Sequence, residues 1–214
     1  MYYQLLYLFL SVKNFFCYPI TSIDMVLFFQ YPATRENEKE RFEGVVKMVD
    51  QFTVAAEAVG ATVKRLSGLT EAVQYLRGVT GGERVAVSAL PKEYAALLDA
   101  FSMVAPTEYP DVGFCISAAQ AGIAQTGSLL LDLGDPTGRS ATALSPIHFV
   151  LLKKSTILPD LRAAAPLLGT VLDAGEHAYL SLTTGPSRTA DIERVLTIGV
   201  HGPRELHILI LEGA

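Results

Sequence analysis

The alternation of two kinds of segment in the first half of the chain is the feature that most constrains its fold. Short apolar runs take turns with amphipathic stretches, at 61–66, 69–77, 84–88, 91–100 and 112–116. A strand–helix–strand order of this kind is typical of parallel sheets, because each helix carries the chain back to the starting edge of the sheet. The sequence therefore predicts an α/β fold with a largely parallel, Rossmann-like sheet flanked by helices.

The second half is denser in strands. Further apolar runs predict strands at 127–132, 148–152, 178–182 and 206–211. Near-continuous apolar runs suit strands that are buried on both faces. Helices are predicted at 35–59 and 160–172, and the glycines and proline of 134–138 indicate a turn or mobile loop.

Charge and cysteine content exclude several classes of function. The net charge is −5 and no basic run is longer than the pair Lys153-Lys154, so nucleic acid is not an expected partner. The two cysteines, Cys17 and Cys115, stand apart, which indicates neither a disulfide framework nor a metal or iron–sulfur site. No dinucleotide fingerprint follows the early strands. We expect no cofactor, and a cytoplasmic location.

The first 30 residues differ from the rest of the chain in being strongly apolar and aromatic. The uninterrupted apolar stretch is shorter than the roughly 20 residues that cross a bilayer, and it lacks the basic start and small-residue end of a signal peptide. We expect an N-terminal extension over 1–30, a single domain over 31–214, and no membrane association. The alternative for the first segment is a signal sequence or a membrane anchor.

Three polar clusters are candidates for a ligand site. The first comprises Gln125, Thr126, Gly127 and Ser128, where the glycine permits close approach of a ligand and the neighbours supply hydroxyl groups. The alternative is a turn that merely begins a strand. The second comprises Arg139, which can grip a carboxylate or phosphate, and His148, a potential proton donor. The alternative, favoured for an isolated histidine, is a structural role.

The third cluster follows a strand and a Gly-Pro break. It comprises Gly185, Ser187, Arg188, Thr189 and Asp191, and His201 follows between two glycines. A helix that begins near Ser187 or Thr189 would offer free backbone N–H groups to an anion. The hydroxyl residues alternatively serve only as N-caps. An arginine at the positive end of a helix needs an anionic partner, which is either a ligand phosphate or carboxylate or a carboxylate side chain.

Taken in order, these clusters resemble the LUD domain of the lactate-utilisation protein C family. The resemblance covers about Ala55 to Glu212 and rests on GIAQTGSL (122–129), LSPIH (144–148), GPSRTADIE (185–193) and GVHGPRELH (199–207). The first motif of that family usually reads Glu-Thr-Gly. Gln125 replaces the glutamate here, which removes a possible general base or nucleophile from this position.

The resemblance implies a fold similar to the NagB/RpiA/CoA-transferase group, with a ligand near the carboxyl ends of the parallel strands. It also implies a role in L-lactate oxidation, together with iron–sulfur partner proteins that carry the redox centres. The leading hypothesis is therefore a subunit of a lactate-oxidising assembly that binds a small anion, a carboxylate or a phosphate, where the three clusters converge. The alternatives are an autonomous enzyme of the CoA-transferase or isomerase kind, acting on a phosphorylated or thioester substrate, and an interaction module.

Overall fold

The computed structural model describes most of the chain beyond the N-terminal segment. The described residues are 35–88, 90–94, 97, 99–173, 179–190, 196–198 and 202–213. The chain divides into two units, 1–42 and 43–214, and the helix α3 (Arg35–Ala58) begins in the first and ends in the second. The boundary expected at residue 30 falls outside the described residues. The described strands all belong to the second unit.

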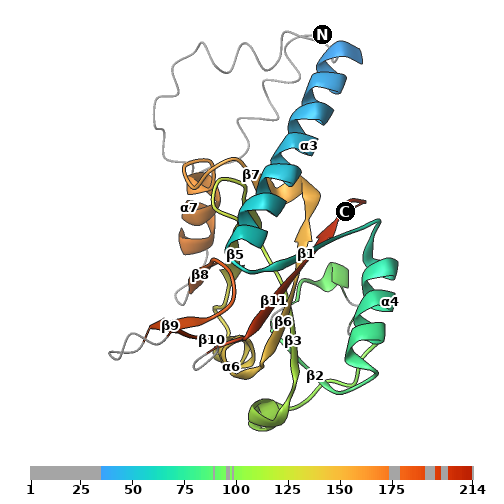
Figure 1. Cartoon of the computed structure of the whole chain (residues 1–214), viewed down its shortest axis with the longest axis vertical. Helices are drawn as coiled ribbons and strands as arrows, with labels where there is room; N and C mark the ends of the chain where they lie inside the picture. Colours follow the sequence, from blue (N-terminus) through green and yellow to red (C-terminus); the bar gives the residue numbers. More distant parts are fainter. Residues whose placement is uncertain are drawn as a thin grey trace, which may run out of the picture. The chain divides into compact units, whose positions relative to one another are not determined.

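A five-stranded parallel sheet forms the centre of this unit (Figure 1). Its strand order is β1-β11-β6-β3-β2, and every neighbouring pair is parallel. The strands are β1 (Thr62–Leu66), β11 (Glu205–Leu211), β6 (Ile147–Lys153), β3 (Phe114–Ala118) and β2 (Val85–Val87). The predicted α/β fold with a largely parallel sheet is confirmed.

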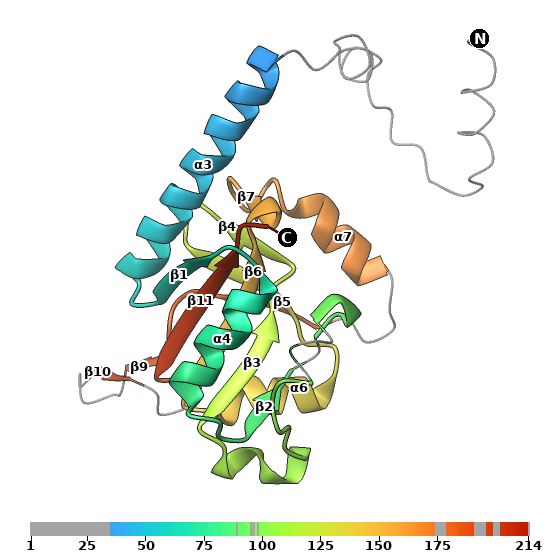
Figure 2. The ribbon, with the colours of Figure 1, turned by 90° about the vertical axis from the view of Figure 1, so that its right-hand side faces the viewer.

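The two longest strands, β6 and β11, are apolar along almost their whole length because both of their faces are covered. Phe149 and Leu151 of β6 face α4 (Leu69–Thr80), which packs on one side of the sheet through Leu76 (Figure 2). The alternate residues, such as Val150, face the other side. Burying each of these large side chains stabilises the fold by about 1.5–3 kcal/mol relative to exposure.

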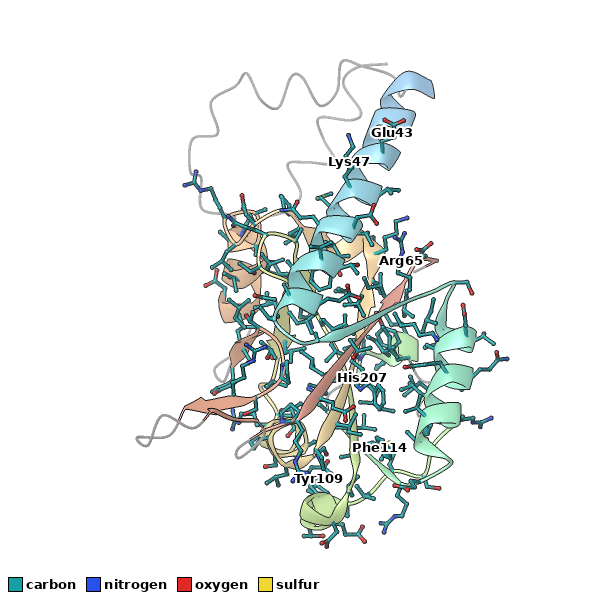
Figure 3. All side chains as sticks on the ribbon, in the orientation of Figure 1. Glu43, Lys47, Arg65, Tyr109, Phe114 and His207 are labelled. Atoms are coloured by element: carbon teal, nitrogen blue, oxygen red, sulfur yellow. The ribbon has the colours of Figure 1, made fainter. Side chains whose placement is uncertain are left out.

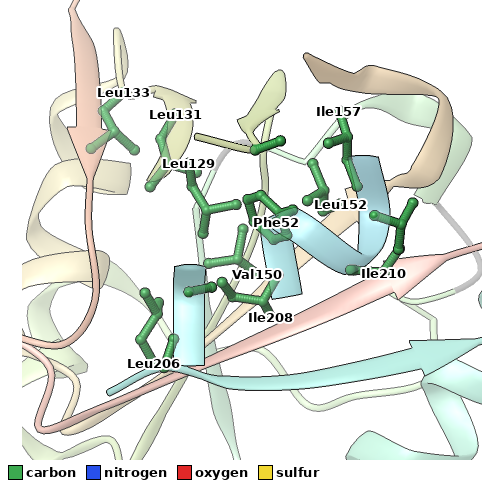
Figure 4. Packing of buried hydrophobic residues seen from close by; sticks show 14 residues of the cluster. Phe52, Leu129, Leu131, Leu133, Val150, Leu152, Ile157, Leu206, Ile208 and Ile210 are labelled. Carbon is green, nitrogen blue, oxygen red and sulfur yellow. The ribbon is translucent and has the colours of Figure 1, made fainter. Parts of the chain in front are cut away.

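A second sheet covers the other face together with α3. It has four strands in the order β7-β4-β5-β8, in which β5 pairs antiparallel with both β4 and β8, and β7 pairs parallel with β4. The strands are β7 (Ile157–Leu158), β4 (Ala121–Ile123), β5 (Ser128–Asp132) and β8 (Leu180–Thr183). Phe52 of α3 packs between Leu129 of β5 and Leu152 of β6, so helix, second sheet and main sheet share one core (Figure 4).

Ion pairs on the surface join α3 to the carboxyl end of the main sheet. Arg65, labelled in Figure 3, donates through Nη1 to Asp50 of α3 at 3.0 Å and through Nε to Glu212 at 2.6 Å. All three side chains are more than a third exposed, so these pairs add little to stability. They fix the direction in which α3 leaves the sheet.

Several local predictions differ from the structure. The loop expected over 134–138 is instead the start of α6 (Pro136–Leu144), because Asp135 accepts hydrogen bonds from the first free N–H groups of that helix. The helix expected over 160–172 is the shorter α7 (Ala165–Asp173). Of the helix expected over 91–100, the described part contains the 3₁₀ turn η1 (Lys92–Tyr94).

The prediction of a helix that begins near Ser187 or Thr189 is wrong. That segment forms the strand β9 (Arg188–Ala190), which pairs antiparallel with β10 (Leu196–Ile198). Pairing between two segments overrode the local pattern of hydroxyl and acidic residues that reads as a helix start. The described residues therefore offer no helix N-terminus at this position.

Candidate functional site at the end of α3

Two glycine loops close on the last turns of α3. A Cβ added to Gly127 would lie 2.2 Å from the backbone nitrogen of Ala56, and one added to Gly185 would lie 2.6 Å from the carbonyl oxygen of Val59. Both glycines also have positive φ, +65° and +74°. No other residue fits either position without moving the helix. The Thr-Gly-Ser and Gly-Pro-Ser motifs therefore hold a helix between them.

The helix end itself is a Schellman motif. Gly60, at φ +92°, donates its N–H to the carbonyl of Glu57, and Ala61 donates to the carbonyl of Ala56. The carbonyl of Val59 is satisfied from elsewhere: Nη2 of Arg188 donates to it at 2.6 Å. A cation is favourable here, because the C-terminus of a helix carries a partial negative charge of about half an electron.

Arg188 thus lies at the negative end of a helix, whereas the sequence predicted it at the positive end of one. The prediction set its charge against the positive end of a following helix, where only an anionic partner would stabilise it. In the structure its charge complements the negative end of α3, and its side chain is exposed. An anionic ligand is therefore not needed to explain the presence of Arg188.

A chain of hydroxyl groups lies beside the helix end. Oγ of Ser128 is 2.7 Å from Oγ1 of Thr126 and 2.7 Å from Oγ1 of Thr184. Ser128 is buried, whereas Thr126, Thr184 and the neighbouring Gln125 are exposed. We name the assembly of these hydroxyls, the two glycine loops, Arg188 and the end of α3 the α3 junction.

The last two motifs interlock with one another at the amino edge of the main sheet. The N–H of Ser187 donates to the carbonyl of Pro203, and the N–H of Arg204 donates to the carbonyl of Pro146. A Cβ on Gly202 would lie 3.1 Å from the Cβ of Ser187. The motif residues thus gather where β6 and β11 begin. The expected location at the carboxyl ends of the parallel strands is wrong for them.

His148 is a buried core residue. It is 1% exposed, and its Nε2 lies 2.7 Å from Oγ of Ser117, which is 2% exposed. Burial lowers the pKa of His148 to about 4, so the ring is neutral at physiological pH. The geometry agrees with the structural alternative for this residue and gives it no contact with solvent through which a proton could reach a ligand.

Arg139 lies away from the α3 junction. It belongs to α6, where Nη1 donates to the carbonyl of Leu133 at 3.5 Å and the guanidinium stacks 4.8 Å from the ring centre of Tyr179. Leu133 and Tyr179 flank the far end of the β5–β8 pair, whereas Ser128 and Thr184 lie at the near end. Four residues of strand separate these ends by about 13 Å.

The remaining site predictions fall partly outside the described residues. Asp191 and His201 lie outside them, and Thr189 is described only as backbone of β9. His207 closes the fourth motif and packs against Phe149 with 4.9 Å between ring centres, while its Nε2 lies 2.9 Å from Glu205 (Figure 3). It faces the α4 side of the sheet and takes no part in the α3 junction.

A surface pocket of about 450 Å³ lies elsewhere, at the amino ends of β2 and β3. Its lining includes Glu83, Glu108 and Asp111, with Arg84 tied to Glu108 at 2.6 Å. It contains none of the motif residues. Within the described ranges, no group of three or more His, Cys, Asp or Glu residues is placed to hold a metal ion, and no helix is long and apolar enough to cross a membrane.

Sequence reasoning missed the contact partners of several candidate residues. Ser117, Val59 and Tyr179 each contact a predicted residue, yet none belongs to a polar cluster in the sequence. The only sequence signal was the helix stop at Gly60, which placed a helix end at this position without indicating its neighbours.

Comparison with known families now identifies the domain. Residues 107–211 match the model of the LUD domain, and this segment contains the Thr-Gly-Ser loop, the Gly-Pro-Ser loop and Arg188. The chain carries a LUD domain. The contacts of the α3 junction thus join LUD domain residues to the end of a helix that precedes the matched segment.

Curated relatives of the LUD domain protein include both long and partial matches. The uncharacterized protein YkgG of Escherichia coli (strain K12) is 28% identical over 193 residues, 84% of this chain and 83% of that protein. Lactate utilization protein C of Macrococcus caseolyticus is 31% identical over 99 residues, 45% of this chain and 43% of that protein. The chain covers less than half the length of that second relative.

A solved structure agrees with the fold. The crystal structure of a duf162 family protein from Deinococcus radiodurans superposes with a TM-score of 0.57, covering 78% of this chain and 98% of that one, at 16% identity. This likeness concerns the fold alone.

Proposed function

We propose that this protein serves lactate utilisation by binding a small carboxylate at the α3 junction. The observation that carries the proposal is that polar residues of both glycine loops gather at the end of α3. Arg188 donates to Val59, and Thr126 and Thr184 precede the two glycines that pack against the same turns. Guanidinium and hydroxyl groups are suited to the two functional groups of a 2-hydroxy acid. Relatives named Lactate utilization protein C support the metabolic assignment.

The energetics favour a ligand of this kind despite the adjacent helix end. The negative end of α3 costs a bound carboxylate about 0.3–1 kcal/mol. A charge-assisted hydrogen bond from Arg188 contributes about 1.5–3 kcal/mol. The arginine therefore outweighs the helix dipole, and the hydroxyls add further bonds.

Oxidation itself would take place with partners. Conversion of lactate to pyruvate releases two electrons and two protons, and the electrons need an acceptor. We assign that acceptor to iron–sulfur partner proteins, because the sequence contains two cysteines and a cluster of this kind usually needs four. The role of this chain is to bind and orient the anion. Its cytoplasmic location, and the alternative of an autonomous transferase or isomerase, stay predictions.

Isothermal titration calorimetry of the full chain with L-lactate and with pyruvate tests the proposal. We expect Arg188→Ala to weaken binding by one to two powers of ten on the hydrogen-bond energies above. Arg77→Ala removes an exposed arginine of α4, on the other side of the main sheet, and should leave affinity unchanged. Equal affinity in both variants, with both folded by circular dichroism, would refute the assignment of the site.

A further inference from the structure

We propose that the α3 junction selects ligands with one negative charge over ligands with two. Its ligand is then a monocarboxylate, and not a phosphate ester or a dicarboxylate. This inference rests on the proposed function, since it takes the α3 junction as the ligand site. It adds a charge preference that the motif residues do not reveal, and it separates lactate-like ligands from the phosphorylated and thioester substrates of the alternative hypothesis.

The positive charge available at the junction is already partly used. Arg188 donates to the carbonyl of Val59 at 2.6 Å, at the end of α3. The helix end carries about half a negative charge, so arginine and helix together leave a net charge of about +0.5. The bond to Val59 uses one of five guanidinium N–H donors, and a single carboxylate needs two.

The described side chains of the two loops are neutral, and the last turn of α3 adds the exposed, acidic Glu57, which lowers the positive charge further. Gln125, Thr126, Ser128 and Thr184 supply amide and hydroxyl groups, which form hydrogen bonds without adding charge. The N–H of Ser187 is taken by the carbonyl of Pro203. The described loops therefore offer neither a second cation nor the row of backbone N–H groups with which a helix N-terminus binds phosphate.

Charge discrimination follows from how two opposing effects scale. Attraction to a fixed charge grows in proportion to the charge of the ligand, whereas the Born cost of removing an ion from water grows with the square of its charge. A field of about half a charge compensates the desolvation of a monoanion at a half-exposed site. It does not compensate the fourfold larger cost of a dianion. We expect a preference of at least about tenfold.

The test compares L-lactate with malonate and inorganic phosphate at pH 8 and constant ionic strength, by calorimetry on the full chain. Lactate is a monoanion under these conditions, whereas malonate and most of the phosphate are dianions. Malonate is close to lactate in size but lacks its 2-hydroxyl group. Propionate, a monoanion that also lacks the hydroxyl, is therefore titrated beside it, and the difference between propionate and malonate reports charge. Gln125→Lys adds a cation at an exposed position of the junction. It should raise the affinity for phosphate by about tenfold and lower the preference for lactate.

The outcomes separate this inference from the proposed function. Lactate binding at least tenfold tighter than malonate and phosphate, with Gln125→Lys reducing the gap, supports both. Malonate binding as tightly as propionate, or phosphate as tightly as lactate, with affinity lost in Arg188→Ala, overturns the charge preference and leaves the anion site in place. Absence of binding by all of these anions overturns both.

Discussion

The guanidinium of Arg188 donates a hydrogen bond to the carbonyl oxygen of Val59, 129 residues earlier in the chain, at a distance of 2.6 Å. The bond ties the start of β9 to the end of α3, next to the glycine loops that grip the same helix. The Gly-Pro-Ser-Arg motif thus has a structural role in this protein, whether or not a ligand is present.

Loss of this bond should lower stability by a modest amount. We expect Arg188→Ala to reduce the free energy of unfolding by about 1 kcal/mol, less than a buried charged hydrogen bond contributes, because the side chain is exposed. Urea denaturation followed by circular dichroism measures the change. An equal midpoint for Arg188→Ala and the unsubstituted protein would show that the helix end does not depend on Arg188.

The packing of Gly127 against α3 predicts a much larger effect. Gly127→Ala places a Cβ 2.2 Å from the backbone of Ala56, at a φ of +65°, so the loop or the helix must move. We expect a loss of about 3 kcal/mol or more in the free energy of unfolding. Gly78→Ala is the matched control. Gly78 lies within α4 with open space around it, and alanine there should stabilise the protein by up to about 1 kcal/mol. Similar effects of the two substitutions would contradict the packing.

Stability should fall on mild acidification because of His148. Its pKa is about 4 in the folded protein and about 6.5 when unfolded, so the unfolded state binds more protons between these values. The contribution of His148 to the free energy of unfolding is fully present above pH 6.5 and decreases as the pH falls toward 4. The free energy of unfolding should therefore drop by about 2 kcal/mol between pH 7 and pH 5. Urea denaturation at pH 7, 6 and 5 measures the slope.

A control variant isolates the histidine. Carboxylates with lowered pKa, such as Asp135 and Glu108, affect stability mainly below pH 5, outside this window. His148→Gln keeps a polar group near Ser117 and removes the titration. Its free energy of unfolding should be nearly independent of pH between 7 and 5. An equal slope of the free energy of unfolding against pH in both proteins would show that another group causes the pH dependence.

The sequence predicted the main sheet because its signals are local. The apolar runs of β6 and β11 are buried on both faces, so their composition alone indicates central parallel strands. The second sheet was not foreseen, although strands close to β5 and β8 were predicted. Their antiparallel pairing joins segments some fifty residues apart, and no turn sequence signals it.

The candidate site was predicted in part for the same reason. Oγ of Ser128 lies 2.7 Å from the hydroxyl oxygens of Thr126 and Thr184, whereas Arg139 and His148, which were predicted to join them, have other partners. The location of Arg188 was inverted, because its partner is a carbonyl at the end of a distant helix. His148 is buried because Ser117 lies beside it on the neighbouring strand, a contact that parallel pairing creates and the sequence does not display.

Nuclear magnetic resonance mapping of backbone amides during titration with L-lactate tests the central claim most directly. The account predicts the largest shifts at Gly60, Thr126, Thr184 and Arg188, which surround the end of α3. These shifts should be lost in Arg188→Ala. Shifts confined to Glu83, Arg84 and Asp111, around the pocket at the amino ends of β2 and β3, would contradict it and place the ligand there instead.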